Sequence, residues 1–471
     1  MSISEYFEAK KRLYPQAAKG HFRKLKNILN TVFLTIYLLS PFLRYDRGEN
    51  APDQAILIDF PNSKAYFFFI EIWPNEVYYL AGILIIAAIT LFFITSLFGR
   101  VWCGYACFQT VWTDIFIAIE RLFQGNRNER IILDRKNTFE KFYKKGLTHL
   151  SFIIVSIVTG FAFTNYFNDS YQQISNLFNN KLSLNVVGWT LGIGFATYIM
   201  AGFAREHVCT YMCPYSRFQS AMFDKNTLII SYDEKRGEPR GKYKQGDSFE
   251  GRGDCIDCKQ CVVVCPAGID IRNGLQMECI ACGLCIDACN DIMEKINRPK
   301  NLIRYDTQSH LDSRLDESKF KIFSNRFFFY SVILTCVTSI MLFSLINKSS
   351  FEATMLANRN PAYITLSDGS IRNGYELKLI NKTHNAQKIF LRISNFQDAE
   401  IKIINYENDD KILSINPESN KSFKLFITIP KEALININED RIMLKVSLFD
   451  NNQEKLTDVN AVFIWDKPIS Q

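Results

Sequence analysis

Five long apolar stretches constrain the fold of this chain more than any other feature of its sequence. They lie at residues 27–44, 77–98, 147–167, 184–204 and 327–346. Each is close to the length of about 17 to 25 residues that a helix needs to cross the hydrocarbon core of a bilayer. The second and the fifth contain no charged residue. The sequence therefore predicts a polytopic α-helical membrane domain with about five transmembrane helices.

Basic residues between these stretches predict how the helices are oriented. Residues 99–146 contain nine lysines and arginines, whereas residues 45–76 contain two and residues 168–183 contain one. Because basic loops stay in the cytoplasm, we expect the N-terminus and residues 205–326 inside and the last 125 residues outside. The net charge of +7 then reflects membrane orientation, and no nucleic-acid partner is expected.

Eight of the thirteen cysteines lie between residues 255 and 289. The first four match C-x2-C-x2-C-x3-C-P, the run with which bacterial ferredoxins bind 4Fe-4S clusters: Cys255, Cys258, Cys261 and Cys265, followed by Pro266. The same spacing recurs in the last four: Cys279, Cys282, Cys285 and Cys289. A zinc site also tolerates C-x2-C pairs but does not need two complete runs. The sequence therefore predicts a ferredoxin-like segment with two 4Fe-4S clusters.

In two-cluster ferredoxins each run supplies the fourth ligand of the other cluster. We therefore expect the first cluster to be bound by Cys255, Cys258, Cys261 and Cys289. We expect the second to be bound by Cys279, Cys282, Cys285 and Cys265. Two such centres side by side are typical of an electron-transfer protein.

Four further cysteines form two C-x3-C motifs at the cytoplasmic ends of the second and fourth apolar stretches. They are Cys103 and Cys107 in GRVWCGYACFQTVWTD, and Cys209 and Cys213 in REHVCTYMCPYSRFQ. Residues four apart share one face of a helix, so each pair is expected on one helix, and all four thiols could converge. Sulfur-rich sites favour Cu(I), zinc or iron–sulfur clusters. Packing of small buried thiols is the alternative.

Three other residues near or within the membrane have side chains that can bind metal ions. His149 and His207 lie at the cytoplasmic edge, where each could ligate a metal or a haem or could simply be solvated. Cys336 falls in the middle of the fifth stretch and is expected to be a packing residue. The apolar positions of residues 112–123 recur at helical spacing, which indicates an amphipathic helix along the membrane surface.

The sequence changes character after about residue 350. Segments such as 375–381 and 422–429 alternate apolar and mostly polar residues, and turn-forming clusters separate them. This pattern predicts an antiparallel all-β sandwich of immunoglobulin-like type, without the cysteine pair of antibody domains. It contains no recognisable catalytic group, so a binding or docking role is expected.

The whole order of parts resembles the cytochrome c oxidase accessory proteins of the FixG/CcoG type. Three segments carry the resemblance most clearly: GRVWCGYACFQTVWTD, CVVVCPAGIDIRNGLQMECIACGLCIDAC and RPKNLIRYDT. The resemblance implies a multi-pass protein of the bacterial inner membrane that helps to assemble the cbb3-type oxidase. It implies an oxidoreductase, a cupric reductase that supplies Cu(I), with copper at Cys103, Cys107, Cys209 and Cys213. Phe108 stands where the second motif has Pro214, so the two halves need not be equivalent.

Three functions fit these features. The favoured one passes electrons through the clusters to copper. Its partners would be copper ions or a copper carrier, subunits or assembly factors of the oxidase, and an unidentified electron donor. The second is a quinol-linked electron-transfer subunit in which the membrane cysteines are structural. The third is a non-enzymatic assembly scaffold whose clusters are structural.

The expected organisation has five parts. They are a basic cytoplasmic segment (1–26), a four-helix membrane domain with the two C-x3-C motifs (27–220), a cytoplasmic ferredoxin-like domain (221–326), a fifth transmembrane helix (327–346) and a periplasmic immunoglobulin-like domain (347–471).

Overall fold

The computed structural model describes residues 13–48, 51–244, 249–312, 323–396, 398–404, 412–434 and 440–465. The chain forms two compact units. The first comprises Met1–Tyr45 and Gln54–Leu342, and the second comprises Asp46–Asp53 and Phe343–Gln471. The first unit contains the cysteine motifs and nearly all of the membrane helices.

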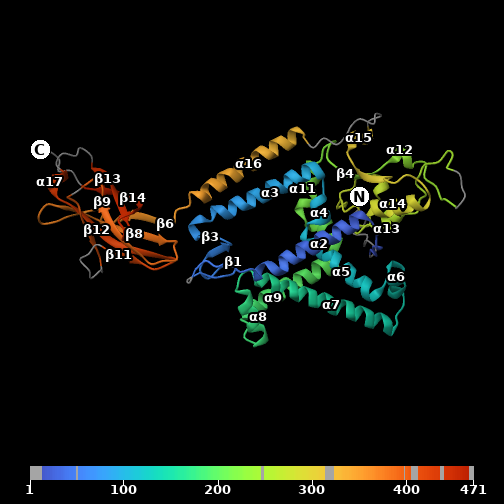
Figure 1. Cartoon of the computed structure of the whole chain (residues 1–471), viewed down its shortest axis with the longest axis horizontal. Helices are drawn as coiled ribbons and strands as arrows, with labels where there is room; N and C mark the ends of the chain where they lie inside the picture. The colour runs from blue at the N-terminus through green and yellow to red at the C-terminus, as the bar shows by residue number, and fades with distance from the viewer. Residues whose placement is uncertain are drawn as a thin grey trace. The chain divides into compact units, whose positions relative to one another are not determined.

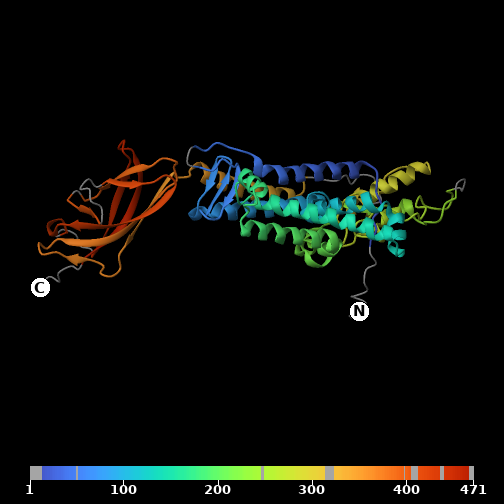
Figure 2. The same cartoon turned by 90° about the horizontal axis from the view of Figure 1, so that it is seen from below.

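Five helices within the described residues are long and apolar enough to cross a membrane, as predicted. The first is α2 (His21–Leu39) with the short η1 (Ser40–Phe42), the second is α3 (Tyr78–Phe98) after η2 (Pro74–Glu76), the third is α7 (Phe139–Thr164), and the fifth is α16 (Asn325–Ile346). The fourth starts as α9 (Leu184–Thr197) and continues through η3 (Tyr198–Ala204), α10 (Arg205–His207) and η4 (Val208–Met212), where η3 and η4 have π-helical geometry. Both views show α2, α3, α7 and α9 running alongside one another (Figures 1 and 2).

Helix α2 begins six residues before its apolar stretch because another part of the fold caps it. The carboxylate of Asp287 accepts hydrogen bonds from the backbone N–H groups of Phe22 and Arg23. A negative charge at this end of a helix is favoured by the helix dipole. A side chain at Gly20 would collide with the same carboxylate, because its Cβ would overlap the Asp287 side chain.

Shorter elements lie at the two ends of the long helices. At one end are α4 (Val101–Tyr105), α5 (Phe108–Gln124), α6 (Arg127–Arg135) and α11 (Pro214–Met222). At the other end are the antiparallel strands β1 (Ile56–Asp59), β2 (Lys64–Phe67) and β3 (Ile70–Ile72), and α8 (Ser170–Phe178). Figure 1 shows α4 and α11 at the same end as the segment that carries the eight cysteines.

The amphipathic helix predicted around residues 112–123 is present as α5, but its apolar face is covered by protein. Trp112 and Phe116 are buried against Phe152 of α7 and Ala201 of η3. The prediction of an amphipathic helix is therefore confirmed. The prediction that its apolar face lies on the membrane surface is wrong, because neighbouring helices cover that face.

The eight-cysteine segment folds around a small two-stranded antiparallel sheet. Strand β4 (Ile229–Tyr232) pairs with β5 (Ile303–Asp306), so the two ends of the segment lie together. Between them are α12 (Glu234–Gly237), α13 (Gln260–Val263), η5 (Ile271–Asn273) and α14 (Leu284–Lys295), and α15 (Gln308–Asp312) follows β5. Ile230, Met293 and Leu302 pack in one apolar cluster that includes Cys255, Cys261 and Cys289.

The second unit contains the two-layered antiparallel sandwich that the sequence predicted. One sheet has the order β10-β12-β8-β6 with β7 beside β8, and the other has the order β11-β9-β13-β14. The strands are β6 (Phe351–Ala357), β7 (Ile364–Thr365), β8 (Ile371–Asn381), β9 (Gln387–Ile393), β10 (Glu400–Ile403), β11 (Ile412–Ile415), β12 (Ser419–Ile429), β13 (Arg441–Phe449) and β14 (Lys455–Ile464), with the short helix α17 (Lys431–Leu434) between β12 and β13. Alternate side chains of both sheets form one apolar core.

Candidate metal centres

The structure gathers the eight clustered cysteines around two cavities. One cavity is lined by Cys255, Cys258, Cys261 and Cys289. The other is lined by Cys265, Cys279, Cys282 and Cys285, and Cys261 also reaches it. In each cavity three cysteines come from one run, and the fourth comes from the other run. We call the first set the distal site and the second set the proximal site, because the second lies against α4.

The chemistry of these thiols fits iron–sulfur clusters. Burial raises the pKa of Cys265 to about 11 and the pKa of Cys279 to about 12. Burial likewise raises the pKa of Cys261 and that of Cys289 to about 12. A thiolate is stable in such surroundings only when a metal ion replaces its proton. The eight thiols around the two cavities are a suitable ligand set for two 4Fe-4S clusters.

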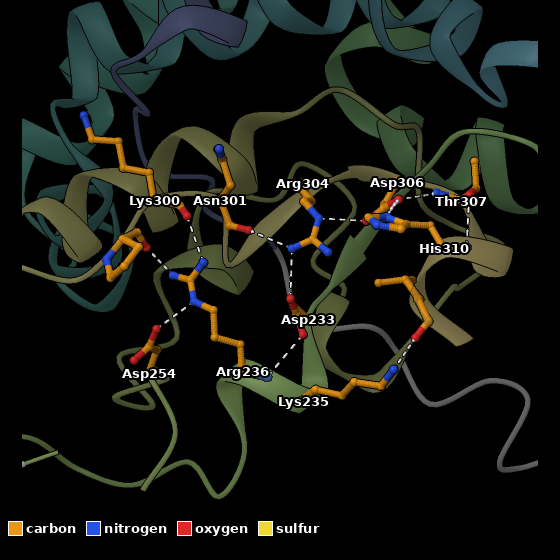
Figure 3. A network of polar contacts seen from close by, with 12 residues as sticks. Asp233, Lys235, Arg236, Asp254, Lys300, Asn301, Arg304, Asp306, Thr307 and His310 are labelled. Atoms are coloured by element: carbon orange, nitrogen blue, oxygen red, sulfur yellow. Dashed lines mark hydrogen bonds and ion pairs between the residues drawn. The ribbon is translucent and has the colours of Figure 1, made fainter. Parts of the chain in front are cut away.

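A polar network fixes the loop that precedes the distal site (Figure 3). Asp254, next to Cys255 in sequence, is buried and accepts hydrogen bonds from Arg236 Nε at 2.7 Å and Arg298 Nε at 2.5 Å. Arg304 donates to Asp233 and Asp306, at 2.9 and 2.7 Å. These contacts account for three of the four charged residues of RPKNLIRYDT, namely Arg298, Arg304 and Asp306, because they join the region of β5 to the segment that carries Cys255.

Each C-x3-C motif spans a junction between two helices, which corrects the prediction that each pair shares one helix. Cys103 lies in α4, whereas Cys107 is the N-cap of α5 with φ −63° and ψ 127°. Cys209 lies in η4, whereas Cys213 is the N-cap of α11 with φ −80° and ψ 112°. In the second motif Pro214 explains the break, because a proline disfavours helical geometry in the residue before it.

The four thiols nevertheless lie in one neighbourhood, although among the described residues no three of their sulfur atoms lie within 4.8 Å of one another. Cys103 is within electrostatic range of Cys107 and Cys213, and Cys209 is within range of the other three. Burial raises the pKa of Cys103 to about 11. The amide Nε2 of Gln219 in α11 lies 3.0 Å from the Cys103 Sγ. We call this group the four-cysteine site.

Helix α4 docks directly on the loop of the proximal site. A Cβ at Gly104 would lie 2.8 Å from the Ile280 carbonyl oxygen and 2.9 Å from that of Ala281, so only glycine permits this approach. The Tyr105 hydroxyl donates to the Cys282 carbonyl at 3.0 Å. The four-cysteine site and the proximal site are therefore neighbours.

A cavity reaches Cys209 between the membrane helices and the eight-cysteine segment. Its wall includes Asp114, Glu206 and Cys209 on one side and Glu278 on the other. His149 and His207 line a second cavity. There the His149 Nδ1 lies 3.0 Å from the Tyr198 hydroxyl, and the His207 ring stacks on Tyr211.

Cys336 does not pack in a core, contrary to the sequence prediction. It is exposed, and α16 buries none of its described side chains. An apolar helix that faces lipid leaves its small residues on the outside, so an intramembrane position alone does not indicate packing.

Three residues at these sites were not identified from the sequence, namely Arg100, Gln219 and Asp254. Each lies within a few residues of a cysteine motif, at positions −3 from Cys103, +6 from Cys213 and −1 from Cys255. Proximity to a motif was the available signal, but the contacts that give these residues a role are all with distant parts of the chain.

Comparisons with protein families agree with these parts. A family model described as a 4Fe-4S dicluster domain matches residues 204–308, and a 4Fe-4S binding domain matches residues 80–127. A model of the IG-like fold at the C-terminal of FixG matches residues 341–466. The fold and the sites thus define a membrane iron–sulfur protein with an immunoglobulin-like domain.

Similar proteins identify the family. The nitrogen fixation protein FixG of Rhizobium meliloti is 39% identical over 461 residues, which cover 90% of this chain and 88% of that protein. Protein RdxA of Cereibacter sphaeroides is 45% identical over 81% of this chain and 82% of its own length. Protein RdxB of the same organism is 42% identical, with 85% of each chain covered. The chain belongs to the FixG family, as the sequence resemblance implied.

Proposed function

We propose that the chain is an electron-transfer protein that reduces Cu(II) to Cu(I) at the four-cysteine site. Cys255, Cys258, Cys261 and Cys289 would bind one 4Fe-4S cluster, and Cys265, Cys279, Cys282 and Cys285 the other. When bound, each cluster supplies one electron at a time. The cavities described above support this assignment, since each is lined by one complete set of four cysteines.

The observation that carries the copper proposal is the convergence of four thiols beside the proximal site. Soft thiolate ligands prefer Cu(I) to harder ions, so Cys103, Cys107, Cys209 and Cys213 stabilise the product of reduction. One electron from the clusters converts one Cu(II) to Cu(I). A low-potential one-electron donor then returns one electron to the clusters. Cys209 also lines a cavity whose wall contains both acidic and basic side chains, and this cavity would leave room for an ion beside that thiol.

The proposed setting is the bacterial inner membrane, with the eight-cysteine segment in the cytoplasm and the sandwich in the periplasm. Basic loops support this orientation. We infer that the Cu(I) product serves assembly of the cbb3-type oxidase and that the sandwich docks on oxidase subunits or assembly factors. The membership in the FixG family supports this role.

Metal analysis combined with a copper-reduction assay tests the proposal. Anaerobically purified protein should contain about eight iron and about eight labile sulfide per chain, and after reduction by dithionite and its removal it should convert Cu(II) to Cu(I). Changing the four cysteines of the four-cysteine site to serine should abolish copper binding and reduction with the iron content retained. Cys336→Ser is the matched control. Reduction by the quadruple variant at the wild-type rate would refute the copper role.

A second candidate is an iron–sulfur centre at the four-cysteine site itself. The 4Fe-4S family model over residues 80–127 favours it, because that segment contains only the cysteines Cys103 and Cys107. Four thiols from two halves of a protein can bind such a centre as well as copper. Iron content distinguishes the two, since a third cubane would raise it to roughly twelve per chain.

A further inference from the structure

Arg100 is a buried cation at the junction between the four-cysteine site and the proximal site. It is 5% exposed. Its guanidinium donates to the backbone carbonyl of Met277, to that of Cys279 at 3.3 Å and to that of Ser216 at 2.9 Å. One side chain thus ties α11 to the loop that enters the proximal site, and it does so from a position three residues before Cys103.

The charge of Arg100 has no carboxylate paired with it. Among the described residues it forms no salt bridge, and its buried Nε has no hydrogen-bond partner. The groups within its electrostatic range are Cys103, Cys279, Glu278 and Tyr215. An arginine keeps its charge in proteins, and a buried charge without a counter-ion is costly. Glu278 acts on Arg100 without forming an ion pair, and metal-bound thiolates on both sides of Arg100 would supply further negative charge.

The distal site shows a contrasting arrangement. Arg272 lies within range of Cys261, but it donates to Asp257 at 2.6 Å and to Asp270 at 2.8 and 2.6 Å. Two carboxylates therefore neutralise this arginine locally. Arg100 is different because its guanidinium donates to backbone carbonyls and to no carboxylate among the described residues.

We propose that Arg100 is a positioning residue shared by the two sites, which raises the reduction potential of the proximal site and stabilises the negative charge of metal-bound thiolates at the four-cysteine site. Adding one electron to the proximal site adds one negative charge, and a nearby cation in a low-dielectric region stabilises that charge. The hydrogen bonds of Arg100 also hold α11, and with it Gln219, against the proximal loop. This inference rests on the proposed binding of two 4Fe-4S clusters by the eight cysteines. Only the effect on the four-cysteine site depends on copper.

Potentiometric titration followed by electron paramagnetic resonance tests the inference, with dithionite as the reductant. Arg100→Met should lower the reduction potential of the proximal site and leave that of the distal site unchanged, so the distal site serves as an internal control. Arg100→Lys should give a proximal potential between those of Arg100→Met and the wild type. Lysine keeps the positive charge but lacks the guanidinium that donates to three carbonyls. Iron content must remain at the wild-type level in the variants compared.

Arg121→Met is the matched control. Arg121 also donates to backbone carbonyls, those of Pro15 and Gln16, and its Nε also lacks a partner. The charged groups that act on it most strongly are Arg23, Arg130, Asp114 and Glu120. An unchanged proximal potential in Arg100→Met, or an equal shift in Arg121→Met, would overturn the inference.

If Arg100→Met fails to assemble its clusters, the decision falls to Arg100→Lys. A proximal potential above that of cluster-bearing Arg100→Gln supports the charge effect, and a potential equal to that of Arg100→Gln contradicts it. A second readout is the affinity for Cu(I), measured by competition with a chromophoric chelator, which should fall several-fold in Arg100→Gln. If the Arg100 variants shift the proximal potential but the wild type reduces no copper, the proposed copper reduction is refuted and the role of Arg100 stands. Copper reduction with no shift would refute the role of Arg100 alone.

Discussion

The side-chain amide of Gln219 lies 3.0 Å from the sulfur of Cys103, although 116 residues separate them in the sequence. Gln219 is completely buried, and its Oε1 has no partner among the described residues. Buried polar atoms are nearly always hydrogen-bonded. The amide therefore belongs to the four-cysteine site, where a bound ion or water would complete its contacts.

Replacement of Gln219 by leucine should weaken Cu(I) binding by about 10- to 100-fold, the usual effect of losing a residue that orients a metal ligand. The reason is that an N–H donor stabilises the thiolate form of Cys103. The measurement is a competition titration with a chromophoric Cu(I) chelator. Gln172→Leu, on the exposed side of α8, is the control and should bind like the wild type. Equal affinities in both variants would show that Gln219 has only a packing role.

Exchange of the fourth ligands predicts crossed effects of two substitutions. Cys265 belongs to the first run in sequence but lines the proximal cavity, whereas Cys289 belongs to the second run and lines the distal cavity. Cys265→Ser should therefore perturb the proximal centre and Cys289→Ser the distal one. Electron paramagnetic resonance of the reduced variants distinguishes the two signals. Damage by Cys265→Ser that is confined to the distal centre would contradict the assignment.

An ion pair between helices predicts a loss of stability. Lys26 of α2, 2% exposed, lies 3.4 Å from the carboxylate of Asp114 in α5, to which Arg23 also donates at 2.9 Å. Asp114→Ala leaves these cations unpaired and should cost about 3–5 kcal/mol. Thermal unfolding in detergent measures the loss, and the double variant Lys26→Met with Asp114→Leu should recover part of it. An unfolding midpoint equal to that of the wild type would contradict a stabilising role.

The same carboxylate gives a pH dependence. Burial raises the pKa of Asp114, but Lys26 and Arg23 more than offset this effect and lower the pKa below its usual value. A carboxyl group with a lowered pKa in the folded state stabilises the fold above its ordinary pKa and loses that contribution as the pH falls through the lowered value. The wild type should therefore lose more stability on acidification than Asp114→Asn does. Parallel pH profiles would exclude Asp114 as the titrating group.

The orientation can be tested with reporters. An enzyme that is active only outside the cytoplasm should be active when fused after residue 471 and silent when fused within the loop before Cys255. This expectation follows from the basic loops and from an odd number of crossings. Activity at the internal fusion and silence at the C-terminus would mean that the chain is inserted in the opposite sense.

The sequence by itself determined the number of membrane helices, the immunoglobulin-like sandwich and the presence of iron–sulfur binding domains. Each of these depends on a local regularity: a long apolar stretch, a period of two residues in strands, or a fixed spacing of cysteines. Such patterns are visible in neighbouring residues because their physical causes are local. These causes are contact with lipid, burial of one face of a sheet, and the reach of one loop around a metal centre.

The tertiary structure decided which residues surround these elements. It divided each C-x3-C motif between two helices, buried the apolar face of α5 under α7 and η3, and left Cys336 exposed. It also placed Asp287 at the start of α2, Gln219 beside Cys103, and Arg100 between two groups of thiols. None of these contacts has a sequence signature, because each joins residues far apart in the chain and depends on how closely the helices pack. The cost of burying unpaired charges and polar groups then selects the arrangement in which they meet.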